Sequence, residues 1–382
     1  MKVNCHLHTP YSFSTFKDID DALDRAVAEN VKVVGINDFY TTKGYEEWEK
    51  GCKKRRLYPI FGIELISLNQ EDRKSGLRVN DPANPGRTYI SGKGLTYPFS
   101  LSEPFSSQLL AVEEESNKQV EKMCIKLNEF LNSINAGFVL DLAWIKKELT
   151  QGSLRERHLA RALRMKLFEF CNGDDVKINI LLEKLFGGKT VKSDLTNYAS
   201  LENEIRGNLL KSGGEAYVPE QPDAFLPLQA VCDIIIAAGG IPTYPFLADN
   251  DIGEYTDFER DIVKVANQLT DRGFHSVEFI STRNNVYLLE KYASYLNDQG
   301  FIVTFGSEHN SPVMEPIELF CRNKTPLTEK LEEINFNGAA IIAAHQHLVA
   351  QGLEGYIDVD GYADRSKRDE FINLGRELID SV

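Results

Sequence analysis

Two histidines stand two positions apart near the start of the chain, as His6 and His8. Residues 2–8 are predicted to form a short strand, and side chains two positions apart on a strand point to the same face. Two imidazoles side by side at the end of a strand can share one divalent metal ion, and the ends of barrel strands carry active sites. The pair therefore predicts a metal site, with a pair of structural histidines as the alternative.

Acidic residues follow apolar runs at three further places. Asp38 can bind a metal, orient a ligand histidine or cap the turn that follows its strand. Glu64 ends an apolar run, where an unpaired carboxylate is costly to bury, so it is expected to bind a cation or to form a salt bridge. Glu308 and His309 are neighbours, so on a strand they face opposite sides. Only one of them then faces a shared centre, unless the chain turns there.

A basic group opens a predicted helix at Arg155, Arg157, His158 and Arg161. His158 and Arg161 share one face of that helix at i, i+3 spacing, and the guanidinium fork of arginine suits phosphate oxygens. The group is therefore either a phosphate site or a solvated basic helix face.

These residues are positioned by an alternation of strands and helices at both ends of the chain. Predicted strands cover residues 2–8, 31–36, 58–66, 241–244, 276–280 and 301–305, and predicted helices cover residues 18–29, 45–54, 228–238, 259–272 and 286–298. Such alternation predicts a parallel sheet or barrel with helices outside.

Three other stretches of the sequence do not follow this alternating pattern. Residues 69–94 are polar and rich in glycine and proline, and they are predicted to form a long loop, which makes Lys93 a flexible-loop lysine. From about residue 106 to about residue 210, apolar residues recur at helical spacing and predict an all-α insertion. The C-terminal part is predicted to contain helices at residues 325–334, 338–351 and 366–378.

The composition is that of a folded, soluble protein, with 42% hydrophobic and 26% charged residues. A net charge of −14 argues against broad, non-specific nucleic-acid binding, which needs a basic face, but it is compatible with a small anionic substrate held by a metal. No segment approaches the ~20 apolar residues of a membrane span, and no signal peptide is predicted. The six cysteines are scattered without a C-x-x-C pair, which predicts reduced core thiols and a cytoplasmic protein.

Six segments, in order along the chain, resemble the PHP (polymerase and histidinol phosphatase) family. They are CHLHTPYSFS, VVGINDF, PIFGIELIS, RHLARAL, EAYVP with AAGGIPTYP, and FGSEHN. The resemblance implies an α/β fold, a distorted (β/α)7 barrel with an all-α insertion. The barrel would occupy residues 1–105 and 216–325, the insertion residues 106–215, and a C-terminal helical tail residues 326–382.

The sequence departs from the family pattern where several ligands for the usual two or three metals are expected. No histidine occurs near residues 88–89, and four other ligand positions carry Phe13, Phe39, Tyr244 and Asn310. The remaining ligands, as the resemblance implies, converge on one metal position: His6, His8, Glu64 and Glu308, the last in place of an aspartate. Nitrogen and oxygen ligands of this number suit one Zn, Mn or Fe ion per chain.

The resemblance implies a metal-dependent phosphoesterase that acts on a small phosphorylated substrate, with a nucleotide as one candidate. Asp38 would orient a ligand or act on the attacking water, and Tyr244 or His309 would donate a proton. The substrate phosphate would be bound by Arg157, His158 and Arg161.

The same departures leave a different class of function open. The chain is then a catalytically degenerate module that binds a phosphorylated ligand or a partner protein, with Phe13, Phe39 and Tyr244 filling the space of the lost metals. A third alternative, a hydrolase of C–N bonds, is weaker. No lysine is predicted at a strand end, where such enzymes often have a lysine that supplies their bridging ligand.

Overall fold

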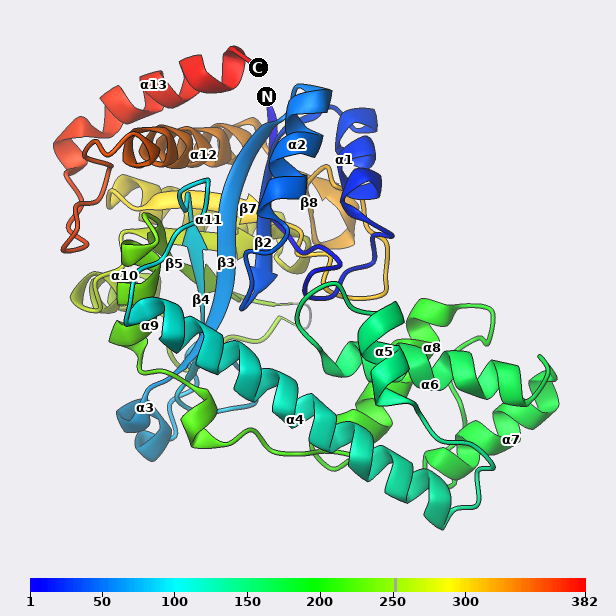
Figure 1. Ribbon diagram of the computed structural model, residues 1–382. Coiled ribbons are helices and arrows are strands. Elements are labelled where there is room, and N and C mark those ends of the chain that lie inside the picture. The colour runs from blue at the N-terminus through cyan, green and yellow to red at the C-terminus, as the bar shows by residue number, and fades with distance from the viewer. Residues whose placement is uncertain (251–252) are drawn as a thin grey trace.

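The computed structural model describes residues 1–250 and 253–382 (Figure 1). Seven strands form one sheet in chain order: β1 (Lys2–Leu7), β2 (Val31–Phe39), β3 (Tyr58–Leu68), β4 (Arg87–Lys93), β5 (Ile241–Phe246), β6 (Ser276–Ile280) and β7 (Ile302–Gly306). Strand β4 runs antiparallel to both of its neighbours, and the other neighbouring pairs are parallel.

The two edges of this sheet meet beyond the ends of β1 and β7. Leu7 and Glu308 form an isolated parallel bridge, and the N–H of His8 donates to the carbonyl of Glu308 at 2.7 Å. The sheet is therefore nearly closed into a barrel flanked by helices, and the predicted (β/α)7-type barrel is confirmed.

Helices cover the outside of the barrel between consecutive strands: α1 (Ile19–Ala28), α2 (Tyr45–Arg55), α9 (Leu228–Ala237), α10 (Ile262–Asp271) and α11 (Val286–Asp298). Side chains cap several of them, as where the carboxylate of Asp18 accepts the N–H of Asp21 at 2.8 Å and begins α1. Shorter elements are α3 (Gln70–Ser75), η2 (Pro222–Ala224), η3 (Ser281–Arg283), β8 (Phe320–Cys321), η4 (Arg322–Lys324), β9 (Thr325–Pro326) and η5 (Arg365–Lys367).

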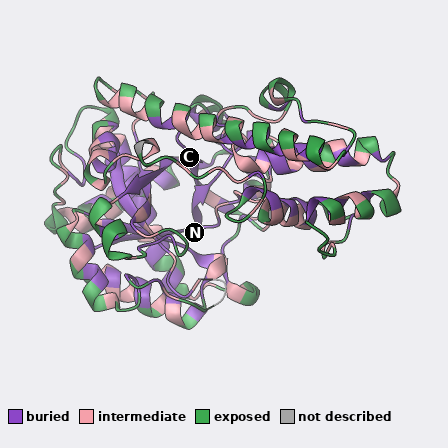
Figure 2. Cartoon of the chain, turned by 90° about the horizontal axis from the view of Figure 1, so that it is seen from below, coloured by how far each residue is buried: buried purple, intermediate pink, exposed green. Residues whose placement is uncertain are grey.

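Helices α4 (Phe105–Ser133), α5 (Leu142–Glu148), α6 (Glu156–Phe170), α7 (Asp175–Leu185), α8 (Tyr198–Ile205) and the π-helical turn η1 (Arg206–Leu210) form an arm beside the barrel (Figure 1). The arm has an apolar core of its own, to which Leu127, Leu163 and Leu182 contribute. Figure 2 shows that its helices turn their buried faces toward one another and their exposed faces to solvent.

Helix α12 (Glu329–Ala350) closes the end of the barrel at which the strands begin, and α13 (Arg368–Asp380) packs against α12. The apolar residues 339–344 of α12, four alanines and two isoleucines, are buried against Val3, Val33 and Ile302, which lie near the starts of their strands. Helix α12 does not cover the opposite end of the barrel, where the parallel strands finish, and this is the end at which barrel enzymes carry their active sites.

Two predictions about these elements are wrong. Residues 69–94 are not one long loop, since they contain α3 and β4, and Lys93 at the end of β4 is fully buried. The helices predicted at 325–334 and 338–351 are one helix. Asn335 continues it with its side chain bonded to the N–H of Phe305 (2.8 Å) and the carbonyl of Val3 (3.1 Å).

Two further sequence expectations concern cysteine and membranes. The six cysteines are buried free thiols, as predicted. None of the helices in the described part of the chain has the length and apolarity that a membrane crossing needs.

Candidate metal centre

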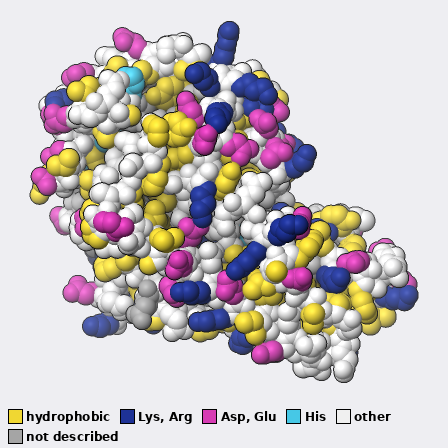
Figure 3. Space-filling model, in the orientation of Figure 1, with side chains coloured by type: hydrophobic (Ala, Val, Ile, Leu, Met, Phe, Trp, Pro, Cys, Tyr) yellow, Lys and Arg dark blue, Asp and Glu magenta, His cyan; other side chains and the backbone are white. Residues whose placement is uncertain are grey.

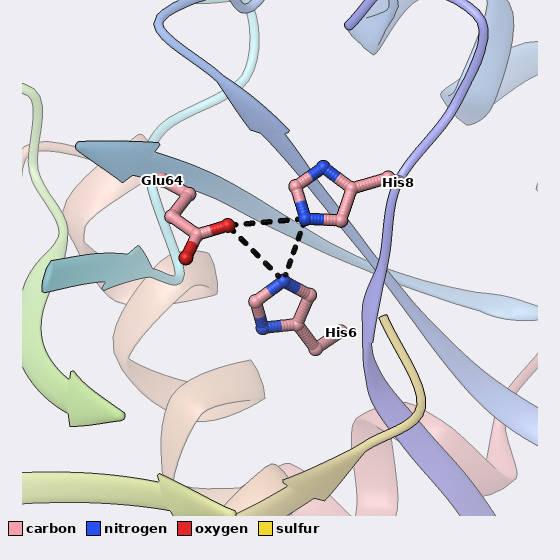
Figure 4. A group of neighbouring side chains, drawn as sticks. All are labelled: His6, His8 and Glu64. Atoms are coloured by element: carbon pink, nitrogen blue, oxygen red, sulfur yellow. Dashed lines mark hydrogen bonds and ion pairs between the residues drawn. The ribbon is translucent and has the colours of Figure 1, made fainter. Parts of the chain in front are cut away.

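The side chains of His6, His8 and Glu64 converge at the end of the barrel opposite α12 (Figure 4). The Nε2 atoms of the two histidines lie 3.1 Å apart, and Oε2 of Glu64 lies 3.0 Å from Nε2 of His8 and 3.7 Å from Nε2 of His6. The histidines are fully buried and Glu64 is 3% exposed. The structure therefore brings together three of the four predicted ligands.

The donor set fits a divalent metal ion. Among the described residues, the buried Oε2 of Glu64 has no polar neighbour other than the facing imidazoles of His6 and His8, so it is available to a cation that those nitrogens share. Burial by itself raises the pKa of Glu64, but His6 and His8 outweigh it and lower this pKa to about 2. Three nitrogen and oxygen donors on one side leave positions for water and a substrate, as in catalytic zinc sites.

A buried ion pair orients the first histidine. Nδ1 of His6 lies 3.0 Å from Oε2 of Glu278, so Nε2 is left to face the centre. Glu278 is held in turn by Nζ of Lys93 at 2.8 Å and by the hydroxyl of Ser91. Burial by itself raises the pKa of Glu278, but the charges of His6 and Lys93 outweigh it and hold this pKa well below its ordinary value.

A second chain of contacts orients His8. The hydroxyl of Ser12 lies 3.2 Å from Nδ1 of His8 and donates to Asp38 at 2.5 Å. Asp38 also accepts the N–H and the hydroxyl of Thr9, at 2.7 and 2.5 Å. Of the alternatives that the sequence leaves open for Asp38, this geometry favours the orienting role.

The chain turns at Glu308 and His309, which is the exception to the expectation that only one of these neighbours faces a shared centre. Both have left-handed backbone conformations, with φ of 62° and 58°. The carboxylate of Glu308 pairs with Arg283 and is not part of the three-residue group, although both residues line the adjoining cavity. Its ligation of a metal therefore stays a prediction.

Neither predicted proton donor lines this cavity. Nδ1 of His309 lies 2.9 Å from the Ser307 hydroxyl, its Nε2 lies 2.8 Å from the carbonyl of Glu315, and its ring stacks on Phe16. The hydroxyl of Tyr244 donates to Oε1 of Glu259 at 2.7 Å, in an apolar layer that includes Phe246, Phe258 and Phe274.

A cavity of about 600 Å³ lies between the barrel and the helical arm and reaches the metal centre, because Glu64 lines it. Its lining carries six cationic side chains, and four of them are paired with carboxylates: Arg87 with Asp81 and Glu220, Arg206 and Lys211 with Glu156, and Arg283 with Glu308. Figure 3 shows Lys and Arg side chains beside acidic ones where the arm meets the barrel. The remaining two cations of the lining are Arg155 and Arg157.

Only one of the three predicted phosphate-binding residues lines the cavity. Arg157 lines the cavity and donates to Asn203 at 2.9 Å. His158 is buried away from the cavity and accepts the N–H of Arg155 at 2.9 Å, and burial lowers its pKa to about 3. Arg161 lies over the ring of Phe13 and near Glu202, also outside the lining.

The sequence interpretation missed Glu278, Lys93 and Arg155. A signal for Glu278 exists, because it is the one charged residue inside the short apolar strand β6. The sequence contains no such signal for Lys93. The residues of β4 that face the barrel interior are polar, so the strand lacks a recognisable apolar pattern. Lys93 does lie at a strand end, but its Nζ bonds Glu278, the carbonyl of Cys5 and the amide oxygen of Asn37, so it is not free to bridge metals.

Comparisons with known proteins agree with this architecture. The PHP domain family matches residues 4–170. An amidohydrolase from Chromobacterium violaceum, whose structure holds sulfate and no metal, aligns with a TM-score of 0.56 and 16% identity over 88% of this chain and 97% of its own. A "putative metal-dependent phosphoesterase" from Bifidobacterium adolescentis aligns with a TM-score of 0.56 and 13% identity, over 87% and 94% of the two chains. No curated protein matches the chain.

Proposed function

We propose that this chain, whose residues 4–170 match the PHP domain family, is a metal-dependent phosphoesterase that acts on a small phosphorylated substrate. The observation that carries the proposal is the buried Oε2 of Glu64 facing the Nε2 atoms of His6 and His8, with which it forms a group of three metal-ligand atoms. Such a centre suits one Zn, Mn or Fe ion per chain. A bound ion of this kind polarises phosphoryl oxygens and lowers the pKa of a bound water.

Other residues of the chain orient the two histidines and bind the substrate. Glu278 fixes the ring of His6, and Asp38 fixes the ring of His8 through Ser12. Arg157 in the wall of the cavity binds the phosphate of the substrate, because a guanidinium forms charge-assisted hydrogen bonds with phosphate oxygens. The cavity is large enough for a nucleotide-sized ligand and small enough to exclude a folded macromolecule.

The test combines metal analysis with a phosphatase screen. Elemental analysis of the wild type is expected to give about one metal per chain, and phosphate mono- and diesters are screened with Mn, Zn and Fe. A His8→Ala variant is expected to lose both metal and hydrolysis, because a site with so few protein ligands cannot spare one. His347→Ala is the matched control, since it removes a half-buried imidazole on α12 at the other end of the barrel. A metal-loaded wild type with no hydrolysis above His8→Ala would contradict the proposal.

A second candidate, a binding module without turnover, is favoured by two observations. Neither Tyr244 nor His309, the side chains predicted to donate a proton, lines the cavity, and Phe39 packs against His8. General acid–base help is worth about 10²–10⁴-fold, so its loss would leave slow chemistry or none. Full metal occupancy and phosphate binding without hydrolysis is the outcome expected of this candidate.

A further inference from the structure

Arginines from the helical arm lie over the aromatic residues that stand at two of the expected metal-ligand positions. Cζ of Arg155 lies 4.3 Å from the centroid of the Phe39 ring. Cζ of Arg161 and of Arg157 lie 4.6 and 5.7 Å from the centroid of the Phe13 ring. Where the resemblance leads us to expect a metal ligand, this chain has an aromatic ring with a guanidinium over it.

The ring of Phe39 connects this guanidinium to the metal centre. It stacks on the ring of His8, with centroids 4.9 Å apart and an angle of 25° between the planes. Arg155 is thus separated by one aromatic ring from an imidazole of the centre, and both Phe39 and Arg155 line the cavity that Glu64 reaches.

The backbone before Arg155 is docked onto the barrel at this same place. The hydroxyl of Ser153 donates to the carbonyl of Phe39 at 3.0 Å, and the N–H of Ser153 donates to the carbonyl of Tyr11 at 2.8 Å. A Cβ at Gly152 would lie 2.2 Å from that carbonyl oxygen, so the close approach requires glycine. The arm is therefore fixed where it presents Arg155 to the cavity.

Arg155 and Arg157 differ from the other cations of the cavity in their partners. Among residues whose side chains the structure describes, neither has a carboxylate within salt-bridge distance, whereas Arg87, Arg206 and Arg283 each have at least one. A guanidinium carries five N–H donors, and Arg157 uses one of them on the amide oxygen of Asn203, so most donors of the two arginines have no protein acceptor among the described residues. An anion in the cavity would satisfy them.

We propose that Arg155, held over Phe39, and Arg157 form an anion clamp that binds phosphoryl oxygens beside a single metal ion. The clamp supplies the fixed positive charge that a further metal ion would otherwise provide, and guanidinium groups suit this because they bind phosphate in bidentate fashion. The inference rests on the proposed function only in taking a phosphate group as the ligand. It assigns Arg155 to the site as a substrate-binding residue.

The test measures the binding of inorganic phosphate to the full chain by calorimetry, with and without prior removal of metal by a chelator. Arg155→Met is expected to weaken phosphate binding roughly 10- to 100-fold in both states, as the loss of a charge-assisted hydrogen bond predicts. Arg155→Lys keeps the positive charge but loses the planar guanidinium that binds two phosphate oxygens at once. A smaller loss of phosphate affinity, about three- to tenfold, is therefore expected. Phosphate binding by Arg155→Met equal to that of the wild type would overturn the clamp.

Arg164→Met is the matched control. Arg164 lies on the same helix, α6, and its Cζ lies 4.2 Å from the ring centroid of Tyr198, but it does not line the cavity. The variant removes the same charge and the same kind of ring contact, and its phosphate affinity is expected to equal that of the wild type. An equal loss in Arg164→Met and Arg155→Met would mean that net charge alone drives binding and would overturn the clamp.

A second variant keeps the test decisive if Arg155→Met does not fold. Phe39→Leu preserves an apolar side chain but removes the ring under Arg155, so a loss of about three- to tenfold in phosphate affinity is expected, and no loss would count against the clamp. Failure of the clamp and failure of the proposed function are distinguishable. Hydrolysis with phosphate binding that is insensitive to Arg155 contradicts only the clamp, and Arg155-dependent phosphate binding without hydrolysis contradicts only the enzyme.

Discussion

Glu278 and His6 form a contact of 3.0 Å inside the barrel, where neither residue has any exposed surface. The contact joins β6 to β1, strands that are not neighbours in the sheet. It occupies Nδ1 and so leaves Nε2 as the nitrogen that faces His8 and Glu64. Carboxylates in this position fix both the tautomer and the orientation of a metal-binding imidazole.

The first prediction follows from that contact. Glu278→Gln is expected to weaken metal binding about 10- to 100-fold, which is the usual effect of losing an outer partner of a ligand histidine. Competition with a chromogenic chelator measures the affinity, and the absorption spectrum of the Co²⁺-loaded protein reports the geometry of the centre. Unchanged affinity together with an unchanged spectrum would show that Glu278 has only a structural role.

The second prediction concerns the cation that accompanies this carboxylate. Lys93→Met is expected to destabilise the fold by about 3–5 kcal/mol, because it removes one of the two cationic partners of the buried Glu278 and leaves only His6 to balance the carboxylate. Removing both charges in Lys93→Met/Glu278→Gln is expected to recover part of that loss, since no uncompensated charge then remains. Urea unfolding measures both variants, and a double variant less stable than Lys93→Met would refute the pairing argument.

The third prediction is a pH dependence of stability caused by Glu259. This carboxyl is fully buried beneath the cavity-lining Leu247, accepts the hydroxyl of Tyr244 and the N–H of Ala248, and burial raises its pKa to about 8. A carboxyl whose pKa is raised on folding contributes stability that is fully present below its unfolded pKa and is lost as the pH rises through the folded value. Between about pH 4.5 and about pH 8 the wild type should therefore lose stability relative to Glu259→Gln, which does not titrate. Urea midpoints that change in parallel for the two proteins would contradict the assignment.

The sequence predicts the parts of the site that local patterns encode. His6 and His8 are recognisable because a spacing of two on a strand places them on one face, and Glu64 because it interrupts an apolar run. These predictions need only β1, in which polar and apolar residues alternate, and β3, which is apolar over most of its length.

The parts that the sequence does not predict depend on contacts between distant strands. Lys93 meets Glu278 only because β4 and β6 flank β5 in the closed sheet. The polar residues of β4 face a polar barrel interior, so the strand has no alternating apolar pattern and resembles a loop. Similarly, Gly338 in α12 suggests a helix end, but the structure uses it to let the helix approach the carbonyl of Val303, where a Cβ would lie 2.1 Å away.

The last prediction decides the part that Glu308 plays. Its backbone is fixed next to the centre, because its carbonyl accepts the N–H of His8, but its carboxylate pairs with Arg283. If Glu308 is the fourth ligand, metal binding must draw this carboxylate away from Arg283, and the cost of breaking that pair reduces its contribution. Glu308→Gln is therefore expected to weaken metal binding about tenfold, and Glu64→Gln, whose carboxylate has no competing cation, considerably more. Arg283→Met should raise the affinity, because the carboxylate is then released without breaking a pair. Chelator competition on the three variants measures this order, and a metal affinity that is insensitive to both Glu308→Gln and Arg283→Met would limit the protein ligands to His6, His8 and Glu64.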